Sequence, residues 1–394
     1  MSIALRLGLF YAVLLAGSGA SGPYAAVWFK SQGLSGAAIG LILASPSLGR
    51  AFTGPALALW ADGFGLRRSP LVVMALGVAA GYVGLALLKG FWPWLLLWFV
   101  TQSLLAGLSP LADVITLRRA RLEGFNYGWP RGMGSAAYVV ANIVVGALLQ
   151  LAAPDGLIAW IAAAALATAG AALWLLPPDR VHESAEKPPR RDRLKGLGEL
   201  LGDPVFVLAI VSTGLIQASH GFYYGFSALT WKHQGLGESW TGLLWGAGVA
   251  VEVGFLWFAE PWRRRVGPER LILLGGLAAV ARWTCLAMSP PLWLLFVVQA
   301  LHALTFTATF VGSLQLVERL APGRNASLAQ TLNSVLTGGF LIGFSTMASG
   351  PLFDALGARG YFAMSLIALA GLAGAACLSP LQRARAAARD SEAA

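Results

Sequence analysis

The sequence predicts an all-α membrane protein in which twelve transmembrane helices form two six-helix bundles related by pseudo-two-fold symmetry. Three observations lead to this fold class. The 394 residues are 57% hydrophobic and 12% charged, with a mean hydropathy of +0.68, which is too apolar for an ordinary water-soluble domain. The chain also divides into apolar stretches of about 20 residues, the length that crosses a bilayer as a helix. Finally, its two halves carry a sequence repeat.

Short polar turns separate most of these stretches, and residues 178–203 form the only long polar one. We therefore expect an N-terminal bundle over 1–177, a cytoplasmic linker over 178–203, a C-terminal bundle over 204–380 and a cytoplasmic tail over 381–394. The first stretch is interpreted as a retained helix because eleven more follow it. The spans are expected to begin near residues 4, 36, 69, 92, 130, 155, 204, 239, 271, 291, 327 and 360.

The basic residues are distributed by topology. A net charge of +10 suits nucleic acid, but most of the Lys and Arg residues lie in the even-numbered connections and near the ends of the chain. The positive-inside rule then places both termini and the linker in the cytoplasm, with the protein in the inner membrane. The expected partners are the lipid bilayer and a small-molecule solute, not nucleic acid, and the chain is expected to be a monomer.

The sequence contains no nucleophile motif, metal-ligand cluster or phosphate-binding loop, so we expect neither an enzyme nor a metal or other cofactor. Cys285 and Cys377 both fall inside spans. They support neither a disulfide framework nor a metal site.

A gapless shift of 202 residues lays KSQGLSGAAIGL, from Lys30, over KHQGLGESWTGL, from Lys232, and continues to pair Gly65 with Gly267. The same loop positions are therefore repeated in both halves. Parallel repeats about an axis along the membrane normal are the architecture of major facilitator transporters, which bind solute at mid-membrane between the halves.

A second motif agrees with this architecture. ADGFGLRR, residues 61–68, lies between spans two and three and resembles the cytoplasmic signature of that superfamily. In the resulting gating loop, Asp62 is expected to accept from the start of a neighbouring helix, Gly65 to permit a tight reversal, and Arg67 with Arg68 to form the basic pair. Two positions depart from the family pattern, and an ordinary basic cytoplasmic turn is the alternative.

Five charged residues lie within the expected spans, namely Arg50, Arg131, Arg282, Asp113 and Glu252. An ionised side chain at the bilayer centre costs roughly 2.5 to 3.5 kcal/mol on insertion scales, so such groups face a partner or a wet cavity. Three positive charges face two acids, which leaves one arginine for a carboxylate on the solute. Structural ion pairs, or an arginine bonded to backbone carbonyls, are the alternative.

The repeat relates some of these charges to one another. The 202-residue shift places Arg50 on Glu252 and Arg131 on Asn333. The opposite charges of Arg50 and Glu252 would then face each other across the cavity, whereas Arg131 and Asn333 would supply a charge from one half and a neutral hydrogen-bonding group from the other. Arg50 and Asn333 therefore join the expected solute site.

Two histidines also fall within spans. His302 is a natural proton carrier, because an unperturbed imidazole has a pKa near 6.5; a histidine bonded to Gln299 in the interior is the alternative. His220 lies close to Tyr223 and Tyr224, whose rings are placed to flank a ring of the solute. Packing at the membrane interface is the alternative for that group.

Several segments resemble one particular family. They are HGFYYGFSALTWKHQG from His220, VVQALHALTF from Val297, SPLAD from Ser109 and YGWPRGMGS from Tyr127. Together they resemble the 3-phenylpropionate permease family of proton symporters over nearly the whole chain. The resemblance implies proton-coupled transport of an aromatic monocarboxylate.

The related galactoside permease holds its solute with an acid on span four and an arginine at the start of span five, and Asp113 and Arg131 occupy those places here. Its proton-coupling acid, arginine and histidine resemble Glu252, Arg282 and His302 in order. One departure is Thr305, which stands where that permease has a second acid.

The predicted function is therefore proton-linked uptake of a small monocarboxylate with an aromatic or other apolar body. Arg131 binds the carboxylate, oriented by Asp113, and protonation at Glu252 and His302 favours the loaded state before the two bundles rock about the site. Two alternatives stay open. One is a proton symporter of a nucleoside or sugar, and the other is a membrane sensor that binds solute without transport.

Overall fold

The computed structural model describes residues 1–151, 153–180, 190–321 and 323–393, with the side chains of 190–195, 324, 379 and 382–393 outside the description. The middle of the predicted linker, 181–189, and the last residue of the predicted tail therefore lie outside the described residues. Within them the chain is helical, and an isolated bridge between Leu66 and Arg180 is the only strand-like pairing.

Each predicted span begins within one turn of the start of a helix. The helices of the N-terminal half are α1 (Ile3–Ser31), α2 (Gly36–Asp62), α3 (Ser69–Leu87), α4 (Phe91–Glu123), α5 (Gly128–Leu151) and α6 (Gly156–Trp174). Those that follow are α7 (Arg190–Leu201), α8 (Pro204–Ala218), α9 (Gly221–His233), α10 (Glu238–Phe258), α11 (Glu260–Val266), α12 (Pro268–Ala287), α13 (Leu292–Ala300), α14 (Thr309–Leu320), α15 (Ala326–Val335), α16 (Ile342–Leu356) and α17 (Tyr361–Ala393).

By length and composition, ten helical segments of the described chain are able to cross a membrane. The last of them runs over 53 residues, Ala326–Leu378, and contains the short turn Gly357–Gly360. Since a bilayer needs about 20 residues, this segment is long enough to cross twice. Helix α2 is not among these ten segments, although it begins where the sequence predicts a span.

Three features depart from a simple series of spans. Helix α7 lies within the predicted linker. The seventh predicted span is broken at Ser219 and His220, between α8 and α9. Two π-helical turns, Ala303–Ala308 and Leu336–Leu341, interrupt the tenth and eleventh spans. Such turns are rare and frequently mark functional sites.

The chain divides into two compact units, and each combines several segments. The first consists of Met1–Ser184, Tyr224–Val249 and Met347–Asp354, and the second of Ala185–Tyr223, Ala250–Thr346 and Ala355–Ala394. Parts of α9, α10 and α16 thus belong to the same compact unit as the N-terminal six helices.

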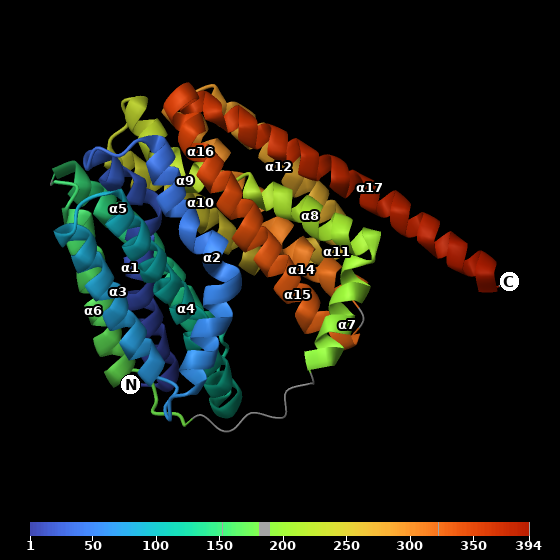
Figure 1. The fold of residues 1–394 in the computed structure, drawn as a ribbon, viewed down its shortest axis with the longest axis horizontal. Helices are drawn as coiled ribbons and strands as arrows, with labels where there is room; N and C mark the ends of the chain where they lie inside the picture. The colour runs from blue at the N-terminus through green and yellow to red at the C-terminus, as the bar shows by residue number, and fades with distance from the viewer. Residues whose placement is uncertain (152, 181–189, 322, 394) are drawn as a thin grey trace. The chain divides into compact units, whose positions relative to one another are not determined.

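In the first unit, α1 packs against α5 and α6, α3 against α4 and α6, and α2 against α4 (Figure 1). Its apolar core comes from α1, α3, α4 and α6, and includes Phe10, Met74 and Ile115, all of them buried. This packing brings polar side chains of α1 and α4 close together.

In the second unit, α8, α12 and α17 lie side by side (Figure 1), and α14 packs against α8 and α12. A smaller apolar cluster, which includes Phe206, Ile210 and Val317, surrounds one end of α8. Arg282 on α12 and His302, which directly precedes the π-helical turn, are both buried in this unit.

The sequence repeat is visible in the turns. Gly33 and Gly235, which the 202-residue shift pairs, have φ angles of 87° and 82°, a left-handed conformation that glycine adopts without steric cost. In both turns the glycine N–H donates to the carbonyl three residues back, at 3.0 Å, and the next N–H donates five residues back. The two turns are therefore the same helix-ending motif.

Asp354 on α16 caps the start of α2 within the first unit. Its Oδ1 accepts from the Gly36 N–H at 2.8 Å and its Oδ2 from the Ala37 N–H at 2.9 Å, so a carboxylate meets the positive end of the helix dipole. Gly36 and Gly350 lie backbone to backbone beside this cap. The absence of side chains at both positions permits the close approach of α2 and α16.

The close contact between α2 and α16 predicts that a methyl group added at Gly350 lowers the stability of the fold. A Cβ at Gly350 would overlap the Gly36 carbonyl oxygen, which belongs to the backbone and cannot turn aside. We expect Gly350→Ala to lower the unfolding midpoint in detergent, because overpacking costs about 1–3 kcal/mol. Gly170→Ala in α6, where a Cβ has nothing within 4 Å, is the control and is expected to leave the midpoint unchanged or raised. Equal midpoints for the two variants would contradict this packing.

Candidate functional site

The Asp113 carboxylate on α4 is held by two tyrosines in the first unit. The Tyr11 hydroxyl donates to Oδ1 at 2.5 Å and the Tyr127 hydroxyl donates to the same oxygen at 3.0 Å. Burial, and then the nearby Asp113 charge, raises the pKa of Tyr127, in the turn before α5, to about 12. The phenol therefore remains a donor at neutral pH.

Arg131 lies beside this pair on the first turn of α5. One guanidinium nitrogen donates to the Ser109 hydroxyl at 3.4 Å, and the guanidinium carbon lies 5.3 Å from the centre of the Tyr11 ring. Among the described residues, Arg131 makes no ion pair, not even with Asp113. A guanidinium has five N–H donors, so most of those on Arg131 are available to a bound anion.

Two pockets open along α4 within the first unit. One has a volume of about 440 Å³ and lies between α2 and α4, where Arg50 lines it. The other has a volume of about 330 Å³ and lies between α1 and α4, where Ser21 and Ser109 line it. Both share Gln102 and Ala106, so they adjoin each other along one face of α4. Their volumes fall in or near the range of small-molecule sites.

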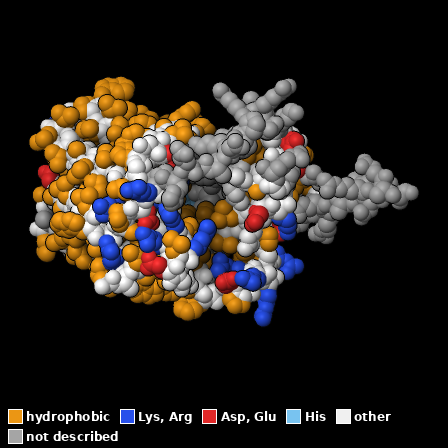
Figure 2. All heavy atoms as spheres, turned by 90° about the horizontal axis from the view of Figure 1, so that it is seen from below, with side chains coloured by type: hydrophobic (Ala, Val, Ile, Leu, Met, Phe, Trp, Pro, Cys, Tyr) orange, Lys and Arg blue, Asp and Glu red, His pale blue; other side chains and the backbone are white. Residues whose placement is uncertain are grey.

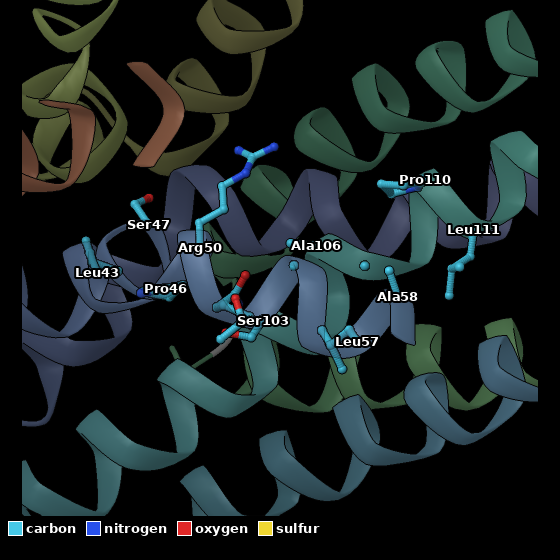
Figure 3. Close-up of a pocket in the computed structure, with 14 residues that line it drawn as sticks. Leu43, Pro46, Ser47, Arg50, Leu57, Ala58, Ser103, Ala106, Pro110 and Leu111 are labelled. Carbon is cyan, nitrogen blue, oxygen red and sulfur yellow. The ribbon is translucent and has the colours of Figure 1, made fainter. Parts of the chain in front are cut away.

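Arg50 is exposed on α2, and it makes no hydrogen bond or ion pair with another described residue. Figure 3 shows its side chain extended away from Ser103 and Leu57, which line the same pocket. Arg50 therefore supplies a positive charge to the pocket between α2 and α4, and no ion pair with a described residue neutralises this charge.

The Arg282 side chain is fully buried in the second unit. It donates to His302 Nδ1 at 2.9 Å, to the Thr305 hydroxyl at 3.0 Å and to Gln299 Oε1 at 2.9 Å. Its guanidinium carbon also lies 4.6 Å from the centre of the Tyr223 ring, within cation–π range. Neutral polar groups and aromatic faces thus surround this charge.

These contacts determine which ring nitrogens carry hydrogens. An arginine only donates, so His302 Nδ1 accepts and the hydrogen of the neutral ring lies on Nε2. His220 Nδ1 lies 3.0 Å from the Gln217 carbonyl oxygen, which only accepts, and its Nε2 lies 3.1 Å from the Thr305 hydroxyl. His220 is therefore hydrogen-bonded at both nitrogens in this arrangement.

Glu252 faces the same cluster from α10. Its carboxylate lies 3.5 Å from His302 Nε2, with 21% of the Glu252 side chain exposed. The hydrogen on His302 Nε2 thus points toward this carboxylate. Among Glu252, Arg282 and His302, the glutamate alone has a substantial exposed fraction, because Arg282 and His302 are buried.

The remaining predicted solute residues lie in different surroundings. Tyr223 is buried and its hydroxyl accepts from Gln299 Nε2 at 2.7 Å. Tyr224 belongs to the first unit and packs against Trp245, with ring centres 6.0 Å apart. Asn333 is buried and exchanges hydrogen bonds with Ser313. Neighbouring helical residues point about 100° apart, which explains why Tyr223 and Tyr224 do not share a face.

The predicted gating loop, residues 61–68, makes contacts that differ from the expected ones. Asp62 is exposed and makes no hydrogen bond with the described residues, because α2 ends at this position and the chain turns away. Arg68 instead donates to the carbonyls of Leu173, in the last turn of α6, and of Leu176, just beyond it, at 2.8 and 3.4 Å. Gly65 does not have a positive φ, whereas its repeat partner Gly267 has one of 80°.

Asp179 contacts this loop in place of Asp62, but it does not cap a helix. Its backbone carbonyl accepts from the Arg67 N–H at 2.8 Å, and its carboxylate forms an ion pair with Arg119. Figure 2, which views from below the end that lies lowest in Figure 1, shows Lys and Arg side chains together with a few acids. The basic character of the even-numbered connections is thus present at this end.

Sequence reasoning did not identify several polar residues of the site. Tyr11 and Tyr127 hold Asp113, and Ser21, Tyr82 and Gln102 form a hydrogen-bonded cluster beside the two pockets. The available signal was the run of polar residues in otherwise apolar spans. Among the described residues, no group of three His, Cys, Asp or Glu side chains is placed to hold a metal ion.

Long apolar helices with charged and polar groups between them define the class of this protein, a multi-pass membrane transporter of the major facilitator type, which is not an enzyme. More narrowly, the chain belongs to the MFS_1 like family, which matches residues 4–364.

Two curated relatives differ in the solute that their names state. A maltose permease of Geobacillus stearothermophilus is 31% identical over 357 residues, which cover 88% of this chain and 86% of the relative. A probable 3-phenylpropionic acid transporter of Escherichia coli (strain K12) is 28% identical over 357 residues, which cover 88% of this chain and 90% of the relative.

Solved structures support the fold. A mutant of the nucleoside transporter NupG matches with a TM-score of 0.84 and 15% identity, over 97% of this chain and 99% of that one. A bacterial homologue of the human lysosomal transporter Spinster matches with a TM-score of 0.70 and 15% identity, over 96% of both chains. At this identity the likeness concerns the fold alone.

The hydrogen bonds around Arg282 predict that removal of the Thr305 hydroxyl lowers the stability of the fold. Thr305→Val keeps the side-chain shape but removes the acceptor for Arg282 and the partner of His220, and an unsatisfied buried group costs about 1–3 kcal/mol. We expect a lower unfolding midpoint in detergent. Thr331→Val, whose exposed hydroxyl donates only to the Ser327 carbonyl, is the control, with an expected change within about 0.5 kcal/mol. A midpoint for Thr305→Val equal to that of the control would show that the cluster does not depend on this hydroxyl.

Proposed function

We propose that the protein is a proton-coupled symporter that takes up a small monocarboxylate with an aromatic or other apolar body, such as 3-phenylpropionate. The availability of the Arg131 guanidinium carries this proposal. Arg131 donates one N–H to the Ser109 hydroxyl and forms no ion pair with a described residue, although it lies in a membrane-spanning helix. A carboxylate on the solute supplies the partner that an intramembrane charge requires.

Asp113 positions the site in this proposal without neutralising Arg131. Both tyrosine hydroxyls donate to the same oxygen of Asp113, and the Tyr11 ring lies against the Arg131 guanidinium. Asp113 therefore orients the ring on which the arginine rests. The pockets along α4 supply mixed apolar and polar walls for the body of the solute.

Glu252 is the proton carrier of the proposed mechanism. Arg282 donates to His302 Nδ1 and so keeps that nitrogen free of a proton, while Nε2–H faces the partly exposed Glu252 carboxylate. A proton that neutralises Glu252 weakens its attraction to His302 and changes the charge of the second unit. Protonation thereby biases the alternating-access equilibrium in one direction, as coupling requires.

The proposed setting is the inner membrane, with both termini and the linker in the cytoplasm, because most basic residues lie in the even-numbered connections. The proton is the coupling ion, and the chain acts as a monomer without a cofactor. In this arrangement the basic loop at Arg67 and Arg68 lies on the cytoplasmic side.

A neutral sugar is the second candidate solute. The 31% identity to a maltose permease favours it, and the hydroxyl and amide groups beside the pockets are suitable partners for sugar hydroxyls. In that case Arg131 and Asp113 hydrogen-bond hydroxyls instead of a carboxylate. The availability of a full positive charge at Arg131 favours the acid over the sugar.

Uptake of labelled 3-phenylpropionate into proteoliposomes with an inward proton gradient tests the carboxylate anchor. We expect gradient-driven uptake in the wild type, abolished by a protonophore and reduced at least about tenfold in Arg131→Ala, because a hydrogen bond to a charged group contributes about 1.5–3 kcal/mol. Arg121→Ala removes an exposed arginine at the end of α4 and is expected to transport normally. Uptake by Arg131→Ala at the wild-type rate would exclude the anchor.

The proton carrier is tested by replacing Glu252 with its neutral analogue. Glutamine resembles the protonated acid but cannot release the proton, so we expect Glu252→Gln to lose gradient-driven accumulation while retaining exchange of labelled for unlabelled solute. Glu260→Gln, which removes an exposed acid paired only with Arg264, serves as the control. Accumulation by Glu252→Gln at the wild-type level would assign coupling to another group.

A further inference from the structure

Ser21, Tyr82 and Gln102 form a closed cluster in the first unit, with one residue each from α1, α3 and α4. Gln102 Nε2 lies 3.1 Å from the Ser21 hydroxyl and 2.7 Å from the Tyr82 hydroxyl, and the two hydroxyls lie 2.7 Å apart. Tyr82 is fully buried and Ser21 is 4% exposed. Each of the three residues contacts both of the others.

The hydrogens of this cluster can be counted. The amide nitrogen supplies two hydrogens and each hydroxyl supplies one. If the amide oxygen faced the hydroxyls instead, only the two hydroxyl hydrogens would be available for three contacts, and one contact would contain no hydrogen. The nitrogen therefore faces the hydroxyls and donates to both, and Gln102 Oε1 is directed away from the cluster.

The remaining hydroxyl contact has a preferred direction. Tyr82 is fully buried and has no other acceptor among the described residues, and a buried donor needs a partner. Tyr82 therefore donates to Ser21, and the hydrogen of Ser21 has no acceptor inside the cluster. Two hydrogen-bonding groups therefore have no partner inside the cluster: the O–H donor of Ser21 and the amide oxygen acceptor of Gln102.

Both left-over groups line the same pocket. Ser21 and Gln102 form part of the wall of the 330 Å³ pocket between α1 and α4, where Trp98 supplies an aromatic surface. Ser109 lines the pocket as well, and its hydroxyl accepts from Arg131. The pocket therefore extends from the donor and acceptor pair to the hydroxyl that Arg131 contacts.

Helix geometry gives the distance along α4 between Gln102 and the residue that Arg131 contacts, Ser109. Gln102 and Ser109 are two turns apart on α4, which corresponds to about 10 Å along the helix axis. A solute whose carboxylate binds Arg131 thus presents its opposite end to Ser21 and Gln102. An apolar end there would bury two unsatisfied polar groups, whereas one hydroxyl accepts from Ser21 and donates to Gln102.

We propose that the solute carries a hydroxyl group at the end opposite its carboxylate, as in a para-hydroxylated arylpropionate, and that Ser21 and Gln102 select for it. This inference rests on the proposed binding of a carboxylate by Arg131. A carboxylate or a ketone at the far end is disfavoured, because neither donates a hydrogen to Gln102 Oε1. A sugar hydroxyl satisfies the pair, but a neutral sugar provides no anion for Arg131.

The test compares the affinities of purified protein for 3-(4-hydroxyphenyl)propionate and 3-phenylpropionate by calorimetry. The wild type is expected to bind the hydroxylated acid about 10- to 100-fold more tightly, since two hydrogen bonds are gained and two unsatisfied groups are avoided. Ser21→Ala and Gln102→Leu are each expected to bring this ratio toward one while they retain or improve binding of 3-phenylpropionate. That ratio distinguishes selection of the hydroxyl from a general loss of fold.

Gln330→Leu, the same substitution in the second unit, is the control and is expected to keep the wild-type ratio. Equal affinities of the wild type for the two acids, or a ratio that persists in both site variants, would overturn the inference and leave the proposed function standing. Binding of neither acid would overturn the proposed function and the inference together.

Discussion

The structure depends on one physical constraint: each arginine within a membrane span must find hydrogen-bond acceptors or water. A guanidinium does not lose its charge in a protein, so every arginine in a membrane span needs acceptors or water. Arg282 finds acceptors in Gln299, Thr305 and His302, so both of its terminal nitrogens are hydrogen-bonded without a solute. Arg131 has a single weak hydrogen bond and an aromatic face. In the proposed mechanism, this difference separates the charge that belongs to the coupling cluster from the charge that binds the solute.

Local irregularities of the helices place these groups. The break between α8 and α9 falls at His220, and the π-helical turn Ala303–Ala308 begins directly after His302. A π-helical turn shifts the helical register by one residue, and here Thr305 reaches both Arg282 and His220. Discontinuous helices at mid-membrane are where transporters form their sites. The fold therefore places its least regular backbone where charge has to be compensated.

The sequence contained most of the fold but only part of the site. Hydropathy located the start of each span, because the length and apolarity of a span follow directly from the bilayer. The repeat was predicted from matching letters and is present in the identical turns at Gly33 and Gly235. Helix α7 was not predicted, because its polar composition, RRDRLKGLGELL, resembles that of a linker.

Side-chain partners could not be read from the sequence in the same way. Asp62 was assigned the capping role because it belongs to the motif, yet Asp179, more than a hundred residues later, reaches the loop instead. Tyr11 and Tyr127 approach Asp113 only after α1, α4 and α5 pack together. Such long-range pairings depend on helix rotation, and a period of 3.6 residues does not determine rotation closely enough for helices that are apolar on nearly every side.

The binding of the solute carboxylate by Arg131 is tested most directly by comparing an acid with its amide on the wild-type protein. Calorimetric titration with 3-phenylpropionate and with 3-phenylpropionamide, which share size and ring, isolates the charge. The account predicts that the acid binds at least about tenfold more tightly, as expected for a charge-assisted hydrogen bond. Equal affinities, or tighter binding of the amide, would contradict it.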